Sequence, residues 1–383
     1  MYKKKPKNIG GVPHQAKPFL VNELISKKDI GAYPFVLFLN QTTDLVPFKE
    51  IIQNLIPDVQ VCIFPEWDTL PYDRVSPSDL ATTQRLETLG SLIHNANKTI
   101  ILTTMAAVIM PTIPAALLKL NSISHTETDP KTRQEILDFA QNTGYLRVDV
   151  VKNKGEYAVR GSLIDIFFIG EQAPLRLDFF DEELETIKTF SEETQVTEDK
   201  VTSFMGLPTS EIVLNKTSID HFRTAYRKRF GTKAYNHPLY NEISNGHRFS
   251  GMEHWLPLFY DYPETMLSYL ADPIIMYEGR DADGLAVFCE NIRDAYLFRE
   301  KTYESGTSDF APLPPSDLYQ SQQLQIVLES GQIIKTSPFR GKEMENYNAR
   351  ALPPLLAEGD GKRSRFNAFK NISNLEKKQV DVL

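Results

Sequence analysis

The chain has few cysteines, no excess of basic residues and no long apolar run, and each shortage excludes a class of protein. Its 383 residues include only Cys62 and Cys289, far apart and each in an apolar context, which excludes a disulfide framework or a cysteine-based metal site and fits a cytoplasmic protein. The formal net charge of -8 argues against a duplex-DNA binder, because such affinity comes largely from basic residues. No apolar run is long enough for a membrane span. The basic N-terminus MYKKKPKNIGG is not followed by the apolar segment of a signal peptide.

Sequence motifs of catalysis are also scarce. The 7 histidines include no pair at the HxxxH spacing of a metal site, and no serine lies in a GxSxG motif. Asp181 and Glu182 follow the apolar run LDFF, as a magnesium-binding pair does in nucleotide motors, but the surrounding acidic residues favour a solvated surface. We therefore expect no catalytic residue, no metal site and no cofactor in this chain.

Between residues 18 and 120, helices alternate with buried strands. A helix opens at Pro18, and the apolar runs at 34–40, 59–64 and 99–104 have the length and composition of strands. This alternation predicts an α/β fold of the doubly wound type, in which a parallel sheet carries helices on both faces.

The loop before the first helix is where such folds bind a phosphate. Its sequence, GGVPHQAKPFL, can be compared with GxxxxGK[ST] if Gly11 opens the motif and Ala16, Lys17 and Pro18 fill its last three positions. Pro13 and Pro18 lack the backbone N–H that would point at a phosphate, Ala16 adds a Cβ where the backbone must approach it, and Pro18 has no hydroxyl for Mg²⁺. We interpret the stretch as a nucleotide site that has been lost, in which Lys17 is left as an exposed charge. The alternative is an unrelated loop with one lysine.

Residues 155–190 hold the densest β-type alternation in the chain. Three short apolar-rich segments, separated by Gly161 and by a later turn, predict an antiparallel meander. In the third segment, LRLDFF, Leu177 points to one face while Arg176 and Phe180 point to the other. Such faces indicate a small sheet that packs on one side and offers the other to a partner.

Changes of pattern divide the chain into four segments. A polar stretch ends the first α/β segment, 1–122, and the β-rich segment 123–206 has the pattern of a smaller α+β domain. The helical pattern returns in 207–318 with one further strand, DPIIMYEG, which we expect to join the first sheet because a lone strand is not stable. The β-rich segment is then an insertion in a discontinuous domain. Residues 319–383 have the pattern of a linker or of an incomplete next domain.

Three stretches of the chain resemble the N-terminal region of the bacterial transcription-repair coupling factor family. They are FPEWDTLPYDRVSP with the following QRLETL, GEYAVRGSLIDIFFIG with LRLDFFDEELETIKTF, and SGMEHWLPLF with LSYL, in this order over about 64–270. The resemblance implies a UvrB-like, motor-like domain with a degenerate ATP site, interrupted by a β-rich insert that binds UvrA. In the family, the ATP-dependent DNA translocase and the RNA polymerase-binding domain lie further along. ATP, Mg²⁺, DNA and RNA polymerase are therefore expected to bind there rather than here.

The resemblance also assigns the partner-binding residues. It places UvrA binding at Arg160 in YAVRG, at Arg176 in PLRLDFF and at Phe180, which ends that motif. It implies a non-catalytic, cytoplasmic module that recruits UvrA in transcription-coupled nucleotide excision repair. Arginine and aromatic side chains commonly dominate the binding energy of an interface, which agrees with this assignment.

Two alternatives stay open. The arginines could have a structural role, in which both pair with Asp165, Asp178 or Glu156 within the sheet. The chain could also be an excinuclease B-type subunit. That protein would have an intact GxxxxGK[ST] loop and a tyrosine-rich hairpin in its first domain, whereas Tyr72 is the one tyrosine between residues 62 and 90 here. A nucleic-acid-binding module with residual ATPase activity is disfavoured by the net charge and by the broken phosphate loop.

Overall fold

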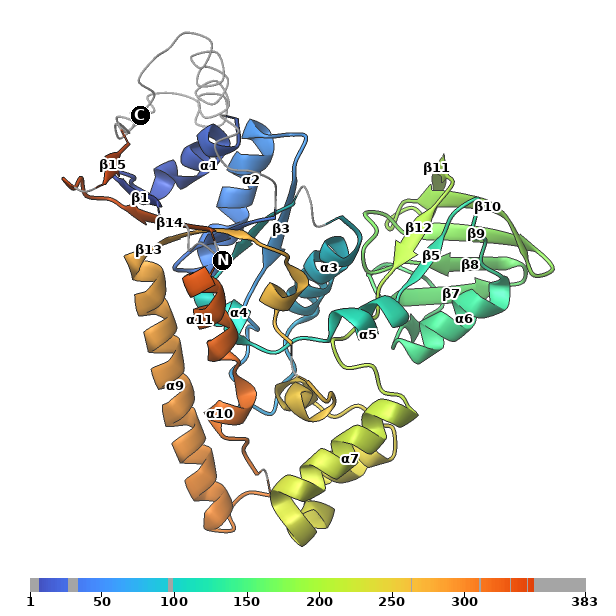
Figure 1. Ribbon diagram of the computed structural model, residues 1–383. Helices are drawn as coiled ribbons and strands as arrows, with labels where there is room; N and C mark the ends of the chain where they lie inside the picture. The colour runs from blue at the N-terminus through green and yellow to red at the C-terminus, as the bar shows by residue number, and fades with distance from the viewer. Residues whose placement is uncertain are drawn as a thin grey trace, which may run out of the picture.

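The computed structural model describes residues 7–26, 34–95, 99–262, 264–309, 311–330, 332–342 and 344–347. Within these ranges the chain forms a large parallel sheet and a separate, mostly antiparallel sheet to one side of it (Figure 1). A two-stranded sheet lies between the two (Figure 1). The predicted α/β fold with a β-rich insert is confirmed.

The parallel sheet has the strand order β15-β1-β14-β13-β2-β4-β3, and all its neighbouring pairs run parallel. Its strands are β1 (Lys7–Gly10), β2 (Phe35–Phe38), β3 (Gln60–Phe64), β4 (Thr99–Thr103), β13 (Ile274–Glu278), β14 (Gln332–Ser337) and β15 (Glu345–Asn346). Strands covered on both faces have continuous apolar sequences, and all four residues of β2, FVLF, are buried.

Helices cover both faces of this sheet, as the doubly wound prediction requires. Alternate residues of β2 belong to two different cores: Phe35 and Leu37 pack in one, and Val36 and Phe38 pack in the other. The first core includes side chains of α1 (Lys17–Ser26) and α2 (Leu45–Leu55). The second includes side chains of α3 (Asp79–Asn95), α4 (Met105–Ile109), α9 (Gly279–Glu304) and α11 (Ser321–Ser330).

The C-terminal part of the described chain returns to the parallel sheet. The predicted strand DPIIMYEG forms β13 beside β2, so its return to the first sheet is confirmed. The prediction that 319–383 is a linker or an incomplete domain is wrong for β14, which lies between β1 and β13, and for β15, which pairs with β1. The run QIIKTS is rich in β-branched residues, but its place between two strands from distant parts of the chain is not encoded in its local pattern. Residues 348–383 lie outside the described residues.

The insert is built on a six-stranded sheet of order β11-β10-β9-β8-β7-β6. All its neighbouring pairs are antiparallel except β6 with β7, so the predicted meander is confirmed. Its strands are β6 (Leu146–Arg147), β7 (Glu156–Arg160), β8 (Leu163–Ile166), β9 (Leu175–Phe180), β10 (Glu183–Phe190) and β11 (Thr197–Val201). Helix α6 (Arg133–Asn142) begins at a capping box between Thr132 and Glu135 and buries Ile136 and Ala140.

The two ends of the insert lie side by side. Strand β5 (Ile123–His125), where the chain enters, pairs antiparallel with β12 (Phe204–Gly206), where it leaves. The remaining helices are α5 (Ala115–Leu120), α7 (Lys216–Phe230), α8 (Pro238–Ser244) and α10 (Pro315–Leu318). Short 3-10 turns are η1 (His14–Ala16), η2 (Thr42–Asp44), η4 (Gly231–Asn236), η5 (Met252–Leu258) and η6 (Met266–Tyr269).

A buried ion pair fixes the chain just after the insert to the large sheet. Arg85 of α3 is fully buried and donates from Nε to Glu211 Oε1 at 2.6 Å and from Nη2 to Oε2 at 3.3 Å. The same guanidinium donates to the carbonyl oxygens of Pro65 and Pro111 and lies 4.1 Å from the ring centroid of Phe64. Because a buried charge is stable only when it is paired and hydrogen-bonded, this cluster fixes the direction in which the chain leaves the insert.

Candidate functional site

The loop between β1 and α1 lies at the carboxyl end of a parallel strand, where α/β folds bind phosphate. Its first backbone donors are directed at protein atoms. The N–H of Gly11 donates to the carbonyl oxygen of Phe339 at 3.0 Å, and the N–H of Val12 donates to that of Ser337 at 2.9 Å. A Cβ on Gly11, whose φ is +74°, would lie 2.7 Å from the carbonyl oxygen of Tyr347. The segment after β14 therefore lies directly against the loop.

The rest of the loop has few donors to offer. Pro13 and Pro18 have no N–H. The N–H of Ala16 donates to the carbonyl oxygen of Pro13 at 2.9 Å, and the N–H of Lys17 donates to that of His14. The loop thus lacks some N–H donors, and others are hydrogen-bonded within the protein. That the chain binds no nucleotide stays a prediction.

The prediction that Lys17 is an exposed charge is wrong. Its side chain is 1% exposed, and its Nζ lies 3.0 Å from Oε2 of Glu278 and 4.0 Å from Oδ2 of Asp281. Glu278 ends β13 and Asp281 lies in the first turn of α9, where the two form a reciprocal capping box. Since β13 comes from a distant part of the sequence, no local pattern around Lys17 reveals these partners.

The carboxyl of Asp281 has a shifted pKa. Burial raises its pKa to about 6, the charge of Lys17 opposes that rise, and the neighbouring charge of Glu278 adds to it. The buried ammonium therefore serves to hold two adjacent carboxylates inside the fold. A lysine in this position does not face a ligand.

On the insert, β9 has the two faces that its sequence predicts. Leu175, Leu177 and Phe179 are buried, Arg176 is partly exposed, and Phe180 is 72% exposed. A phenylalanine that leaves most of its ring in water at the end of an otherwise packed strand is an unusual use of an aromatic side chain. This residue is the clearest candidate for a contact with a partner.

The pairing that the structural alternative expects for Arg176 is present, while its role in partner binding stays a prediction. Its Nε donates to Asp165 Oδ1 at 2.7 Å and its Nη2 donates to Oδ2 at 2.9 Å, so the guanidinium binds this buried carboxylate with two hydrogen bonds. Its Nη1 also donates to the carbonyl oxygen of Gln195 at 3.3 Å, and the guanidinium carbon lies 4.9 Å from the ring centroid of Phe190. Hydrogen bonding to Asp165 raises the pKa of Arg176.

Arg160 has a different environment. It is exposed at the end of β7 and donates from Nη2 to the backbone carbonyl oxygen of Asp149 at 2.6 Å. In the strand register Arg160 lies opposite Leu163, which lies opposite Asp178. Directly opposed residues of a sheet point to the same side, and so do residues two apart along one strand. Arg160, Arg176 and Phe180 therefore share one face of the insert, which we call the outer face.

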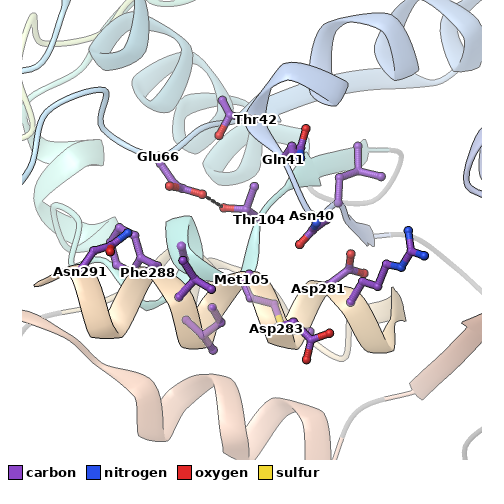
Figure 2. Close-up of a pocket in the computed structure, with 16 residues that line it drawn as sticks. Asn40, Gln41, Thr42, Glu66, Thr104, Met105, Asp281, Asp283, Phe288 and Asn291 are labelled. Atoms are coloured by element: carbon purple, nitrogen blue, oxygen red, sulfur yellow. Dashed lines mark hydrogen bonds between the residues drawn. The ribbon is translucent and has the colours of Figure 1, made fainter.

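A cavity of about 650 Å³ lies where β2, β3, β4 and β13 end, and the sequence analysis missed it (Figure 2). Each of these strands is followed by a polar lining residue: Asn40, Glu66, Thr104 and Asp281 respectively. The hydroxyl of Thr104 donates to Glu66 Oε1 at 2.6 Å. Ligands of open α/β sheets bind at this edge, so polar residues just after successive predicted strands were a signal that could have located the cavity.

In the part of the chain that the structure describes, the His, Cys, Asp and Glu side chains form no group of three or more that could hold a metal ion. Among its helices, none combines the length and the apolar composition that crossing a bilayer requires.

Comparison with known proteins gives one family match, to the UvrB interaction domain, over residues 124–211. Similar proteins include transcription-repair-coupling factors from Haemophilus influenzae (36% identical over 63% of this chain and 21% of that protein), Escherichia coli (32% identical over 73% and 25%) and Rickettsia typhi (30% identical over 74% and 25%). The chain thus spans about a quarter or less of the length of these relatives. The family match covers the insert and ends at Glu211, the residue that binds Arg85.

Proposed function

The chain belongs to the transcription-repair-coupling factor family, and we propose that it acts there as a cytoplasmic, non-catalytic module that recruits UvrA in transcription-coupled nucleotide excision repair. ATP hydrolysis, DNA translocation and RNA polymerase binding we assign to parts of the family proteins that these 383 residues do not represent. The assignment to UvrA rests on the match of the insert to the UvrB interaction domain.

The observation that carries the proposal is the exposed ring of Phe180 on the outer face of that insert. The ring is 72% exposed, whereas its neighbour Phe179 on the opposite face is 3% exposed. Aromatic and arginine side chains are the usual anchors of protein interfaces, and Arg160 lies on the same face. An unburied phenylalanine and an exposed arginine on one face are thus explained by a protein partner that covers both.

The three assigned residues have different roles in this proposal. Phe180 and Arg160 meet the partner directly, because both are exposed. The guanidinium of Arg176 already donates to Asp165 and Gln195. Because these bonds hold it in place, Arg176 contributes a fixed positive charge to the partner-binding face.

The non-catalytic part of the proposal is supported by the loop after β1. The N–H of Gly11 is hydrogen-bonded to Phe339, just after β14, the N–H of Val12 is hydrogen-bonded to Ser337, which ends β14, and Lys17 is paired with Glu278. A bound phosphate would have to displace all three contacts, at a cost that its own hydrogen bonds would need to exceed.

The test is a titration of purified UvrA against the chain and its variants. Phe180→Ala and Arg160→Ala should each weaken binding by about 1 to 4 kcal/mol, the range of an interface anchor, without changing the unfolding midpoint. The matched control is Phe298→Ala, which removes a phenylalanine that is 63% exposed on α9, away from the insert. Equal affinities for the Phe180 and Phe298 variants would show that the outer face does not bind UvrA.

A further inference from the structure

Helix α7 lies at an edge of the molecule, at the lower end of the view in Figure 1. Its buried residues recur every four positions from Ser218 to Tyr226, so one side of the helix is packed and the other meets solvent. Arg227 and Lys228 in its last turn are exposed, and so is Lys233, which follows in η4. Because basic residues also suit the negative end of a helix dipole, their position alone identifies no partner.

The surroundings of these basic groups are more informative. In the part of the chain that the structure describes, Arg227, Lys228 and Lys233 form no ion pair with a carboxylate. Arg229, the other basic residue of the last turn, is by contrast bound to Asp317 at 3.3 Å between Nη2 and Oδ2. A net charge of -8 means that acidic residues are plentiful in this chain, so a shortage of them does not explain the three unpaired groups. We call the exposed side of α7 and η4 that carries them the basic face.

An exposed tyrosine ring lies against one side of the basic face. The guanidinium of Arg227 donates a hydrogen bond to the hydroxyl of Tyr235, which raises the pKa of Arg227. The edge-to-face neighbour of this ring is Tyr240, with 5.7 Å between the centroids and 87° between the planes. The Tyr235 side chain is nevertheless 56% exposed. A ring that is held by two neighbours and still faces water can stack on a flat partner such as a base.

A second exposed ring lies on the other side of α7. His221 Nε2 lies 2.7 Å from Asp261 Oδ1, and its Nδ1 lies 3.0 Å from the carbonyl oxygen of Leu258, so this segment is held against the helix. Tyr262 follows directly and is 81% exposed. Residues seven apart share one side of a helix, which places Lys228 on the side of His221. The basic face thus has an exposed tyrosine on either side.

Single-stranded nucleic acid has the chemistry that this surface fits. Arginine and lysine neutralise phosphates, and stacking on an aromatic ring tolerates any sequence because every base has a π-face. The negative charge of the whole chain does not oppose such binding, because exposed charges further away than about 10 Å are largely screened at physiological salt. We propose that the basic face binds a single nucleic-acid strand, with phosphates at Arg227, Lys228 and Lys233 and bases on the rings of Tyr235 and Tyr262.

Other anionic partners fit this surface less well. A duplex keeps the faces of its bases stacked inside, so the two exposed rings would have nothing to stack on. An acidic protein segment would pair with the basic groups but has no bases for the rings. Asp220, the one carboxylate of α7, lies 3.6 Å from Arg223 and is therefore already paired beside the basic face.

The test is fluorescence anisotropy of labelled oligothymidylate and oligouridylate, each of about 15 nucleotides, titrated with the full chain. Saturable binding of either strand supports the site, and the tighter of the two identifies DNA or RNA as its source. A duplex of the same length should bind at least about fivefold more weakly, because its bases cannot reach the rings. The proposal is overturned by equal or tighter duplex binding, by polyglutamate competing as well as unlabelled strand at equal charge, or by no saturable binding at about 50 mM salt.

Variants locate the strand on α7. Arg227→Gln and Lys228→Gln should each weaken binding and lower the slope of log affinity against log salt by about 0.7, since each removes one phosphate contact. Tyr235→Ala should weaken binding at least about fivefold and leave that slope unchanged, because stacking releases no counterions. The matched controls are Lys200→Gln, an exposed lysine of β11, and Phe339→Ala, whose side chain is 76% exposed after β14.

All the replaced side chains are exposed, so circular dichroism should show a folded chain in every variant. Losses in the two control variants as large as those in Arg227→Gln and Tyr235→Ala would mean that the strand binds elsewhere, and they would overturn the assignment to α7. Unchanged affinity in both Arg227→Gln and Tyr235→Ala would overturn it as well.

Discussion

The loop after β1 and the outer face of the insert each place a basic side chain beside a buried carboxylate. In the loop, the Lys17 side chain is 1% exposed, and the protein itself supplies its partners Glu278 and Asp281. On the outer face, the Arg176 side chain keeps 20% of its surface exposed while it binds Asp165, and Phe180, further along the same strand, is 72% exposed. The difference teaches that residue type does not decide which basic group meets a partner. The decisive factor is whether another part of the chain packs over it.

The largest effect on stability should follow from removing the buried ammonium group of Lys17. Lys17→Ala leaves Glu278 and Asp281 buried without their cation, so the free energy of unfolding should fall by about 3 to 5 kcal/mol. Urea denaturation measures this. The matched control is Lys7→Ala, whose ion pair with Glu345 at 3.0 Å is largely exposed and should contribute about 1 kcal/mol or less. If the loss for Lys17→Ala were as small as that expected for Lys7→Ala, the cluster around Lys17 would not stabilise the fold.

The same cluster should make stability depend on pH. The pKa of Asp281 is about 6 in the folded chain and 3.8 as the reference value, so the folded state holds this proton more tightly. Its contribution is therefore fully present below about pH 4 and is lost as pH rises through about 6, by up to about 3 kcal/mol. Denaturation of the wild type and of Asp281→Asn at pH 4 and pH 7 isolates this residue, because the other carboxyls are common to both. A stability difference that does not change with pH would contradict the prediction.

An intermediate effect is expected on the outer face. Arg176→Ala removes two hydrogen bonds from the buried carboxylate of Asp165. The free energy of unfolding should therefore fall by about 2 kcal/mol, less than for Lys17→Ala because the guanidinium is partly solvated. Phe180→Ala should change stability by no more than about 0.5 kcal/mol, since its ring is already in water. Thermal denaturation of both variants provides the comparison. If Phe180→Ala is the more destabilising of the two, the ring packs within the insert and the outer face is structural throughout.

The smallest expected effect concerns nucleotide binding. Replacing Ala16 by Gly and Pro18 by Thr restores residue types of a phosphate loop, yet the N–H groups of Gly11 and Val12 still donate to the carbonyl oxygens of Phe339 and Ser337. Calorimetry with Mg²⁺ and ATP should therefore show no binding to the wild type or to the double variant. Micromolar binding by either protein would show that the segment after β14 moves aside and that the site is not lost.

The alternation of β9 was predictable from the sequence because the side-chain period of a strand is a local property. Leu175, Leu177 and Phe179 could be assigned to the core, and Arg176 and Phe180 to the other face, without knowledge of the neighbouring strands. The pairing of Arg176 with Asp165 depends on the register between β8 and β9, which sequence spacing alone leaves open.

The sequence by itself determined the alternating order of helices and strands, the two faces of the meander and the missing donors of the loop, because periodicity and proline act over a few residues. Tertiary structure alone decided that β14 lies between β1 and β13, that Lys17 is buried beside Glu278, and that polar ends of four strands enclose one cavity. Each of these depends on contacts between segments far apart in the chain. Such contacts are set by crossover connections and sheet order rather than by local conformational preference.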